Sequence, residues 1–312
     1  MPYHHMTAMR SEAVAFLNCR PGKIYVDGTL GGSGHAALIC EKIMPDGLFI
    51  GIDQDQAAIK NANSVLKSYQ TIIRLFHGNF TNLPDYLEQL EIAKVDGILL
   101  DLGLSQHQLE ASGRGFSFLK DEPLDMRMDM RTTVTAKDLV NSLGQKKLAD
   151  LFFNFGEERR SRAIAGQIII ARKKAPIESS LQLAEIVKKA IPVNSYARQK
   201  IHPATRVFMA LRIAVNKELE KLEQFLDLAI DLLNPKGRLC VLAFHSLEDR
   251  IIKQKFVLWQ TECICPKSFP QCICNHQKTA KLITKKVVRP SKSEVQNNPM
   301  ARSTRLRAIE KL

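Results

Sequence analysis

Between residues 24 and 102, short apolar runs alternate with segments whose apolar residues recur at helical spacing. Strands are expected from the apolar runs at residues 24–27, 47–53, 71–77 and 95–102. Helices are expected between them at residues 35–43, 56–69 and 83–90. Such alternation is typical of parallel βαβ units, so an α/β fold is expected here.

The pattern changes after the fourth strand. Residues 106–130 are rich in Gly, Pro and charge, and no strand period is visible in them. Helical spacing then prevails, and it predicts helices at residues 139–143, 146–155, 157–174, 181–191, 203–219 and 218–233. An apolar run at residues 237–244 predicts a returning strand. We therefore expect a discontinuous domain of residues 1–106 and 215–312, with an inserted helical domain at residues 107–214.

Charge narrows the class of partner. The 312 residues carry a formal net charge of +13, which favours a polyanionic partner such as nucleic acid. No apolar run approaches the roughly 20 residues that span a bilayer. The first five residues lack the features of a signal peptide, so we expect a soluble cytoplasmic protein without a membrane partner.

The C-terminal segment is the most basic part of the chain. Residues 277–312 hold ten Lys or Arg and two Glu. Two interpretations stay open here: a solvated, partly disordered end, or a basic arm that touches nucleic-acid phosphates.

A glycine-rich loop, VDGTLGGSGH at residues 26–35, joins the first strand to the first helix. Glycines at this point let backbone amides approach a ligand closely. The second strand ends in Asp53, and a carboxylate there suits the hydroxyl groups of a ribose. NAD, FAD and S-adenosylmethionine all contain that ribose. The loop does not fit G-x-G-x-x-G, and Asp27 would repel a pyrophosphate, so the sequence favours S-adenosylmethionine.

Four residues are expected at one edge of the sheet, because the carboxyl ends of parallel strands meet there. They are Asp27, Asp53, Phe80 and Asp101. Phe80 would hold an adenine, although packing in the core is the alternative for this ring. Asp27 would lie near the cofactor, or it would serve only as a turn or helix-cap residue.

Motifs along nearly the whole chain resemble one family. They are YVDGTLGGSGH (25–35), DGILLDLG (96–103), RGFSF (114–118), PLDMRMD (123–129), FGEER (155–159), HPATR (202–206), FHSLEDR (244–250) and NPMARS (298–303). In this combination and order they are similar to the bacterial small-subunit ribosomal RNA cytosine-N4 methyltransferases, the RsmH or MraW type.

The resemblance implies a class I, Rossmann-like methyltransferase fold with an inserted all-helical domain for substrate recognition. It implies methyl transfer from S-adenosylmethionine to the N4 amine of a cytosine in the decoding region of 16S ribosomal RNA. Carried over by position, the cofactor contacts fall on Ser33, Gly34, His35, Asp53, Phe80, Asp101 and Gln108. One departure concerns the last contact: the family has Ser-Ser-Pro-Gln where this chain has SQHQ at residues 105–108.

The catalytic and RNA-binding residues are less sharply defined. Asp101 and His245 are candidates for orienting the amine or accepting its proton. The alternative for His245 is a structural start of a helix, with Ser246 as N-cap and Asp249 in a capping box. Candidates for contact with ribosomal RNA, free or in the ribosomal subunit, are Arg114, Arg127, Arg159, His202 and Arg206. Apolar helical faces in the insert permit a homodimer without requiring one.

A cluster of cysteines, CICPKSFPQCIC, contains Cys263, Cys265, Cys272 and Cys274. Four thiols at this spacing either bind zinc or are reduced structural thiols. No metal is expected in the cofactor site itself.

Two other functional classes compete with a methyltransferase. A nicotinamide- or flavin-dependent oxidoreductase would share the strand, loop and helix, but the glycine spacing argues against it. A non-catalytic RNA-binding factor would keep the fold without methyl transfer. Methylation at carbon 5 of a pyrimidine would need a cysteine nucleophile, and none follows the fourth strand.

Overall fold

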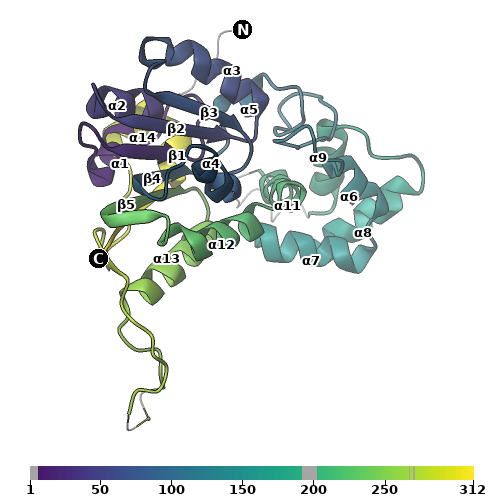
Figure 1. Ribbon diagram of the computed structural model, residues 1–312. Coiled ribbons are helices and arrows are strands. Elements are labelled where there is room, and N and C mark those ends of the chain that lie inside the picture. Colours follow the sequence, from purple (N-terminus) through teal and green to yellow (C-terminus); the bar gives the residue numbers. More distant parts are fainter. Residues whose placement is uncertain (1–5, 192–201, 267, 270) are drawn as a thin grey trace. The chain divides into compact units, whose positions relative to one another are not determined.

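The computed structural model describes residues 6–191, 202–266, 268–269 and 271–312. The first five residues, in which no signal peptide is expected, lie outside this part of the chain. The chain divides into two compact units. We call Ser105–Glu218 the helical unit, and Pro2–Leu104 with Leu219–Leu312 the sheet unit. Figure 1 shows the elements of both units.

The sheet unit is built on seven strands in the order β3-β2-β1-β4-β5-β7-β6. All four strands expected in the first third of the chain are present. The strands are β1 (Ile24–Asp27), β2 (Leu48–Asp53), β3 (Ile73–His77), β4 (Val95–Asp101), β5 (Leu233–Ala243), β6 (Ala280–Leu282) and β7 (Arg305–Lys311). The first five pair in parallel, whereas β7 is antiparallel to both of its neighbours. The Rossmann-like α/β fold class expected from the sequence is confirmed.

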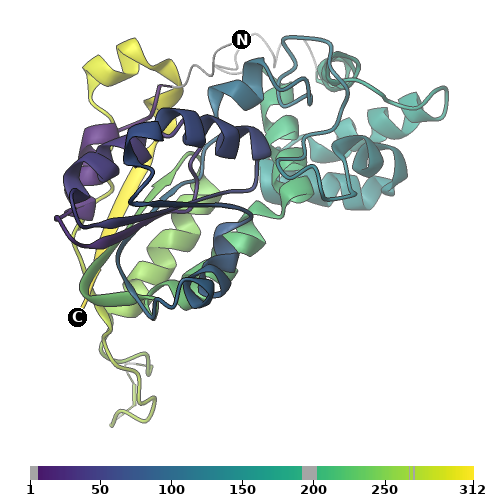
Figure 2. The ribbon, with the colours of Figure 1, turned by 45° about the horizontal axis from the view of Figure 1, so that its top comes forward.

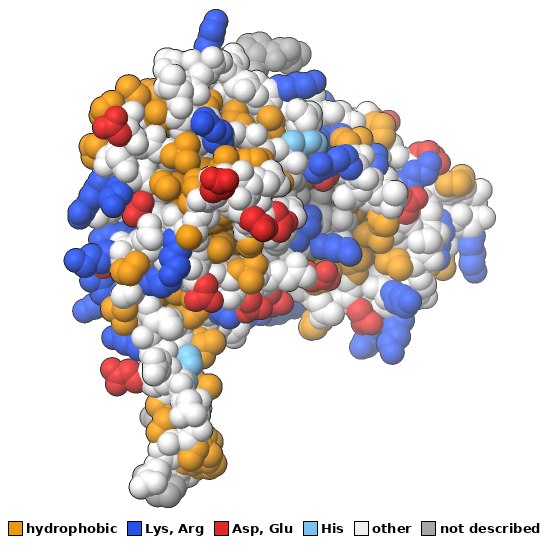
Figure 3. Space-filling view, viewed as in Figure 1, with side chains coloured by type: hydrophobic (Ala, Val, Ile, Leu, Met, Phe, Trp, Pro, Cys, Tyr) orange, Lys and Arg blue, Asp and Glu red, His pale blue; other side chains and the backbone are white. Residues whose placement is uncertain are grey.

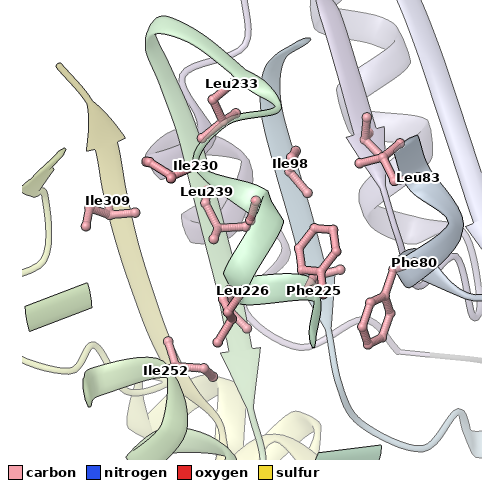
Figure 4. Close-up of a cluster of buried hydrophobic side chains, with 14 of the residues drawn as sticks. Phe80, Leu83, Ile98, Phe225, Leu226, Ile230, Leu233, Leu239, Ile252 and Ile309 are labelled. Atoms are coloured by element: carbon pink, nitrogen blue, oxygen red, sulfur yellow. The ribbon is translucent and has the colours of Figure 1, made fainter. Parts of the chain in front are cut away.

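Apolar side chains cover both faces of the sheet, as parallel strands require. Successive residues of a strand point to opposite faces, so Tyr25 joins one core cluster and Val26 the other. Val26 lies opposite Ile50 of β2 and Ile98 of β4 in register. Figure 4 shows part of the cluster that contains Ile98, Leu239 and Ile309 on the strands.

Each face of the sheet is covered by its own helices (Figure 2). One core cluster contains residues of α1 (Arg10–Leu17), α2 (Gly34–Ile43) and α3 (Gln56–Val65). The short 3-10 turn η1 (Lys67–Tyr69) follows α3. The other cluster draws residues from η2 (Phe80–Asn82), α4 (Leu83–Gln89), α12 (Glu218–Ala229) and α13 (Ser246–Gln260). Ile252, Phe256 and Trp259 of α13 recur every three or four residues, so they share its buried face.

The basic C-terminal segment is part of this fold: a partly disordered end is wrong for its ordered elements, whereas contact with nucleic-acid phosphates stays a prediction. It contributes β6, α14 (Lys292–Asn297), η3 (Pro299–Ser303) and β7. β7 pairs with β5 along its length, and Leu239 lies opposite Ile309. Two of its charged residues are paired, Arg307 with Asp249 and Glu310 with Arg238. The alternation in RLRA, with Leu306 and Ala308 buried, is a signal for a strand, and the high charge of the segment concealed it.

The returning strand is longer than expected. β5 begins at Leu233, opposite Val95, and its register with β4 shifts before Arg238. The preceding helix α12 therefore ends at Ala229. The sequence indicated a helix up to residue 233 because Ile230 and Leu233 continue the helical spacing while belonging to the same buried cluster.

The helical unit contains α5 (Gln106–Glu110), α6 (Ala136–Ser142), α7 (Gln145–Gly156), α8 (Ser161–Arg172), α9 (Ser180–Lys189) and α11 (Ala204–Asn216). Two expected helices are shorter than predicted. The one expected to start at Glu157 begins at Ser161, because Glu157 is left-handed with φ 49°. Gly156 packs so closely on α11 that a Cβ there would lie 2.7 Å from the carbonyl oxygen of Arg206. The helix expected at residues 203–219 ends at Asn216, because Lys217 is also left-handed and separates α11 from α12.

Among the described helices, none combines the length and the apolar character needed to cross a bilayer.

The position of β7 in the sheet predicts that two substitutions near its end affect the free energy of unfolding very differently. Ile309 is fully buried in the core, whereas Leu312 is 55% exposed. Ile309→Ala should lower the free energy of unfolding by about 2–5 kcal/mol because it leaves a cavity, and Leu312→Ala should change it by less than about 0.5 kcal/mol. Urea denaturation followed by circular dichroism measures both. Equal effects would contradict the placement of β7 inside the sheet.

Candidate functional site

Three aspartates end neighbouring parallel strands of the sheet unit. Asp27 closes β1, Asp53 closes β2 and Asp101 closes β4. β1 lies between the other two strands, so all three carboxylates are carried to one edge. In an open α/β sheet this edge is where ligands bind.

The glycine loop is fixed to the sheet by Asp53. The N–H of Gly31 donates to Asp53 Oδ2 at 2.9 Å, and the N–H of Asp55 donates to Oδ1 at 2.8 Å. Gly31 has φ 45°, a conformation that favours glycine. A Cβ on Gly28 would lie 2.5 Å from Leu100 and 2.9 Å from Phe80, so the loop starts with a close approach to β4 and η2.

Thr29 joins two of the aspartates, and the sequence reasoning missed it. Its N–H donates to Asp27 Oδ1 at 3.0 Å, and its hydroxyl accepts the N–H of Asp101 at 2.6 Å. An Asp followed two residues later by Thr is a signal for a side-chain turn, and it could have identified this link. The link confirms that Asp27 shapes the turn.

Burial and crowding weaken the acidity of two of the carboxyl groups. Burial raises the pKa of Asp27 to about 7; the charge of Asp53 adds to this effect, and the bonds from Thr29 oppose it. Burial also raises the pKa of Asp101 to about 7, with Asp27 as the next cause. The buried ring of His35 lies beside Asp101, with 3.6 Å between Nδ1 and Oδ2. The edge therefore holds carboxyl groups that a nearby positive charge would ionise.

The start of α2 presents polar groups at this loop. Ser33 is its N-cap with φ 64°, and no side chain of the described residues caps the helix. The Ser33 hydroxyl and Asp27 Oδ2 are buried and have no hydrogen-bond partner among the described residues. Buried polar atoms are normally paired, so these two indicate a place for a polar ligand.

Gly34 is in contact with the N-terminal segment. A Cβ at this position would lie 2.0 Å from Thr7 Oγ1, and the carbonyl of Gly34 accepts a hydrogen bond from Arg10 Nε at 2.8 Å. A side chain at Gly34 would displace Thr7 whether or not a ligand is present.

Phe80 lies at the start of η2, just after β3, and its side chain belongs to the hydrophobic core of the sheet unit. Its ring meets Phe225 of α12 edge to face, with 5.3 Å between the centroids (Figure 4). Core packing, one of the two roles expected for this ring, is observed. The preceding residue, Asn79, accepts the N–H of Thr81 and donates to the side chain of Gln54 at 3.3 Å.

Gln108 belongs to the helical unit, whereas the other expected cofactor contacts belong to the sheet unit. Its side chain and that of Ser105 form a capping box at the start of α5. Gln108 Oε1 accepts the N–H of Ser105 at 3.1 Å, and Ser105 Oγ accepts the N–H of Gln108 at 3.2 Å. Ser105 and Gln108 thus cap the start of a short helix.

His245 caps α13, but with partners other than those expected. The expected pair of Ser246 and Asp249 is wrong: His245 itself is the N-cap, and Glu248 is its partner in the capping box. Glu248 is 2% exposed and accepts the N–H of Phe244 at 2.8 Å. His245 Nδ1 accepts the N–H of Glu248, and Nε2 lies 3.0 Å from Glu248 Oε1. Both ring nitrogens therefore face Glu248.

Two of the five expected RNA-binding residues hold the loop that follows α5. Arg114 donates to the carbonyls of Arg127 and Met128 at 2.9 and 3.1 Å. Arg127 forms two parallel hydrogen bonds with Asp125, at 2.8 and 2.7 Å. These bonds lower the pKa of Asp125, since they stabilise its charged form against the opposing effect of burial.

The other three expected RNA-binding residues lie elsewhere in the helical unit. Arg159 is exposed in the turn between α7 and α8. Arg206 lies 3.7 Å from the buried carboxylate of Glu158. The ring of His202 stacks on Phe118 with 4.5 Å between the centroids, and its burial lowers its pKa.

Known proteins match this chain along nearly its whole length. The MraW methylase family matches residues 2–312. A ribosomal RNA small subunit methyltransferase H from Desulfosudis oleivorans is 53% identical over 312 residues, which are 100% of each chain. The protein of the same name from Desulforapulum autotrophicum is 53% identical over 98% of each chain. A solved rRNA methylase from Streptococcus thermophilus is similar with a TM-score of 0.43 and 9% identity over 98% of each chain.

The raised pKa of Asp27 predicts a dependence of stability on pH. The folded state favours the protonated acid, so stability should fall by about 1.4 kcal/mol per unit as pH rises from about 4 to about 7, relative to Asp27→Asn. Above pH 7 the difference should be constant. Urea denaturation at several pH values measures it, with the exposed Asp46→Asn as the matched control. A parallel pH profile of wild type and Asp27→Asn would contradict the assignment.

Proposed function

The chain belongs to the MraW methylase family, and from this premise we propose that it methylates the N4 amine of a cytosine in the decoding region of 16S ribosomal RNA. It is an S-adenosylmethionine-dependent methyltransferase, and small-subunit ribosomal RNA is the substrate for which its relatives are named. The observation that carries the cofactor assignment is the row of three aspartates beside two unpartnered buried oxygens. The base and its reacting atom come from the motif resemblance.

The edge suits a cofactor that has a ribose, an amino-acid group and a positive charge. Asp53 uses two hydrogen bonds on the loop, and a carboxylate can accept more, so it is assigned to the ribose hydroxyls. Ser33, Gly34 and His35 at the uncapped start of α2 are assigned to the carboxylate of the methionine group. Asp27 and Asp101 would be favoured in their charged forms by the sulfonium.

Two expected cofactor contacts remain, Phe80 and Gln108. Phe80 is assigned to the adenine end of the site, where η2 follows β3. Its ring is partly committed to Phe225, so backbone atoms of this turn are the suitable contact. Gln108 is assigned to the cofactor by the motif resemblance alone.

S-adenosylmethionine supplies an electrophilic methyl group, and the chain must orient the amine and receive its proton. The amine of cytosine is a weak nucleophile because its lone pair is delocalised into the ring. Asp101 is the stronger candidate to receive the proton, because it closes β4 at the cofactor edge and the sulfonium would favour its charged, proton-accepting form. His245 is less suited, since both of its nitrogens face Glu248; it is assigned a positioning role at the end of β5.

Substrate recognition is assigned to the helical unit. Arg159, His202 and Arg206 are assigned to the RNA, because a half-exposed ring and guanidinium groups suit unstacked bases and phosphates. Arg114 and Arg127 are assigned to shaping the loop of residues 114–128. We expect the enzyme in the cytoplasm, where ribosomal subunits are found. A homodimer stays a prediction; Phe153, Ile170 and Leu181 are the large apolar side chains exposed on α7, α8 and α9.

Methyl transfer tests the reaction directly. Purified protein, tritiated S-adenosylmethionine and small-subunit particles should give label in N4-methylcytidine after digestion to nucleosides. Protein-free 16S RNA in a parallel reaction distinguishes free RNA from the subunit as substrate. Label on carbon 5 or on the ribose would refute the N4 assignment. Binding of the subunit without any transfer would support a non-catalytic factor instead.

The variant Asp53→Ala tests the contact between Asp53 and the cofactor through a measurement of binding, which needs no methyl transfer. The affinity for S-adenosylhomocysteine, measured by calorimetry, should fall at least about tenfold, because charge-assisted hydrogen bonds to the ribose are lost. The exposed Asp46→Ala is the matched control. Removal of the ribose 2′-hydroxyl from the ligand should weaken binding to wild type but not to Asp53→Ala. Equal losses in both proteins would contradict contact between Asp53 and the ribose.

A further inference from the structure

The chain between α13 and β6 forms a narrow projection from the sheet unit, visible at the bottom of Figure 1. We call residues 261–279 the finger. Its base is closed by a hydrogen bond from the N–H of Thr279 to the carbonyl of Trp259 at 2.9 Å and by another from the N–H of Leu282 to Gln260 Oε1 at 3.2 Å. The finger is therefore anchored at one end to the core of its unit.

No described residue of the finger is buried. Ile264 and Ile273 are 53% and 70% exposed, and Figure 3 shows hydrophobic side chains on the surface of its free end. A segment without a core of its own needs another source of stability, such as a disulfide or a structural metal.

The four cysteines of the finger converge at one point. Sγ atoms lie 3.4 Å apart between Cys263 and Cys272, 3.5 Å between Cys272 and Cys274, and 3.8 Å between Cys274 and Cys263. With Cys265 included, all four sulfurs lie within 4.8 Å of one another. Four sulfurs at the corners of a tetrahedron around zinc, with Zn–S bonds of about 2.3 Å, are about 3.8 Å apart.

Backbone amides are directed at these sulfurs. The N–H of Ile264 donates to Cys274 Sγ, and the N–H of Ile273 donates to Cys265 Sγ, both at 3.4 Å. The N–H of Cys265 donates to Cys263 Sγ at 3.4 Å. Such bonds stabilise thiolates, which are the form that binds a metal. They also connect the two Cys-Ile-Cys turns to each other.

We propose that Cys263, Cys265, Cys272 and Cys274 bind one zinc ion as a structural site that holds the tip of the finger. Binding exchanges four thiol protons for four sulfur–zinc bonds, with no change in oxidation state. Two disulfides are the less suitable alternative, because each sulfur has more than one sulfur neighbour. The site is separate from the cofactor edge and does not depend on the proposed reaction.

Metal analysis of the full-length protein, purified under reducing conditions without a histidine tag, should give about one zinc per chain. Replacing one cysteine of each turn, in the double variant Cys263→Ser and Cys272→Ser, should lower the zinc content at least tenfold. Cys19→Ser, outside the cluster, is the matched control and should keep it. Circular dichroism and binding of S-adenosylhomocysteine verify that the sheet unit remains folded.

Wild-type protein gives a second measurement that no folding defect can obscure. Cobalt in place of zinc should produce the absorption of a tetrahedral thiolate complex, and the four cysteines should react with iodoacetamide only after a chelator has removed the metal. Iron in place of zinc would overturn the choice of metal. The absence of bound metal together with no uptake of zinc or cobalt, or a pair of disulfides detected by mass spectrometry, would overturn the site.

Discussion

The pairing of β1 with β2 on one side and β4 on the other is the constraint on which the site depends. It places Asp27, Asp53 and Asp101 at one edge, and it requires the loop after β1 to pass closely over β4. Thr29 and Gly31 tie the loop to two of these carboxylates through hydrogen bonds. The same strands that form the core thus set the spacing of the polar groups, and a slip in register would disrupt both.

This arrangement is unfavourable to the protein alone. Carboxyl groups are buried beside one another, and two buried oxygens have no partner among the described residues. Such features lower stability, and they persist where a ligand supplies the missing interactions. A cationic ligand with polar ends would relieve both defects at once. The binding energy of the cofactor would then be coupled to the folding of the loop.

The sequence was sufficient to predict the central strands and the residues at their ends, because βαβ units are local in the chain and have clear periods. It was insufficient at the turns where helices begin. α8 begins at Ser161 because Glu157 is left-handed, and His245 with Glu248, rather than Ser246 with Asp249, caps α13. The charge of the last segment concealed β7, whose partner β5 lies about 65 residues earlier. Motif resemblance assigned Gln108 to the site, whereas no periodicity or spacing could have done so.

The position of β7 also bears on how the protein is made. Strand β5 has β4 on one side and β7 on the other, and β7 ends at Lys311. During synthesis, the helical unit and the strands up to β4 leave the ribosome first, and the helical unit can fold early because its contacts are local. The edge of β5 remains open until residue 311 has emerged. A nascent chain therefore exposes the unpaired edge of β5 while residues 244–311 are synthesised, and rapid synthesis of this stretch limits association with other chains.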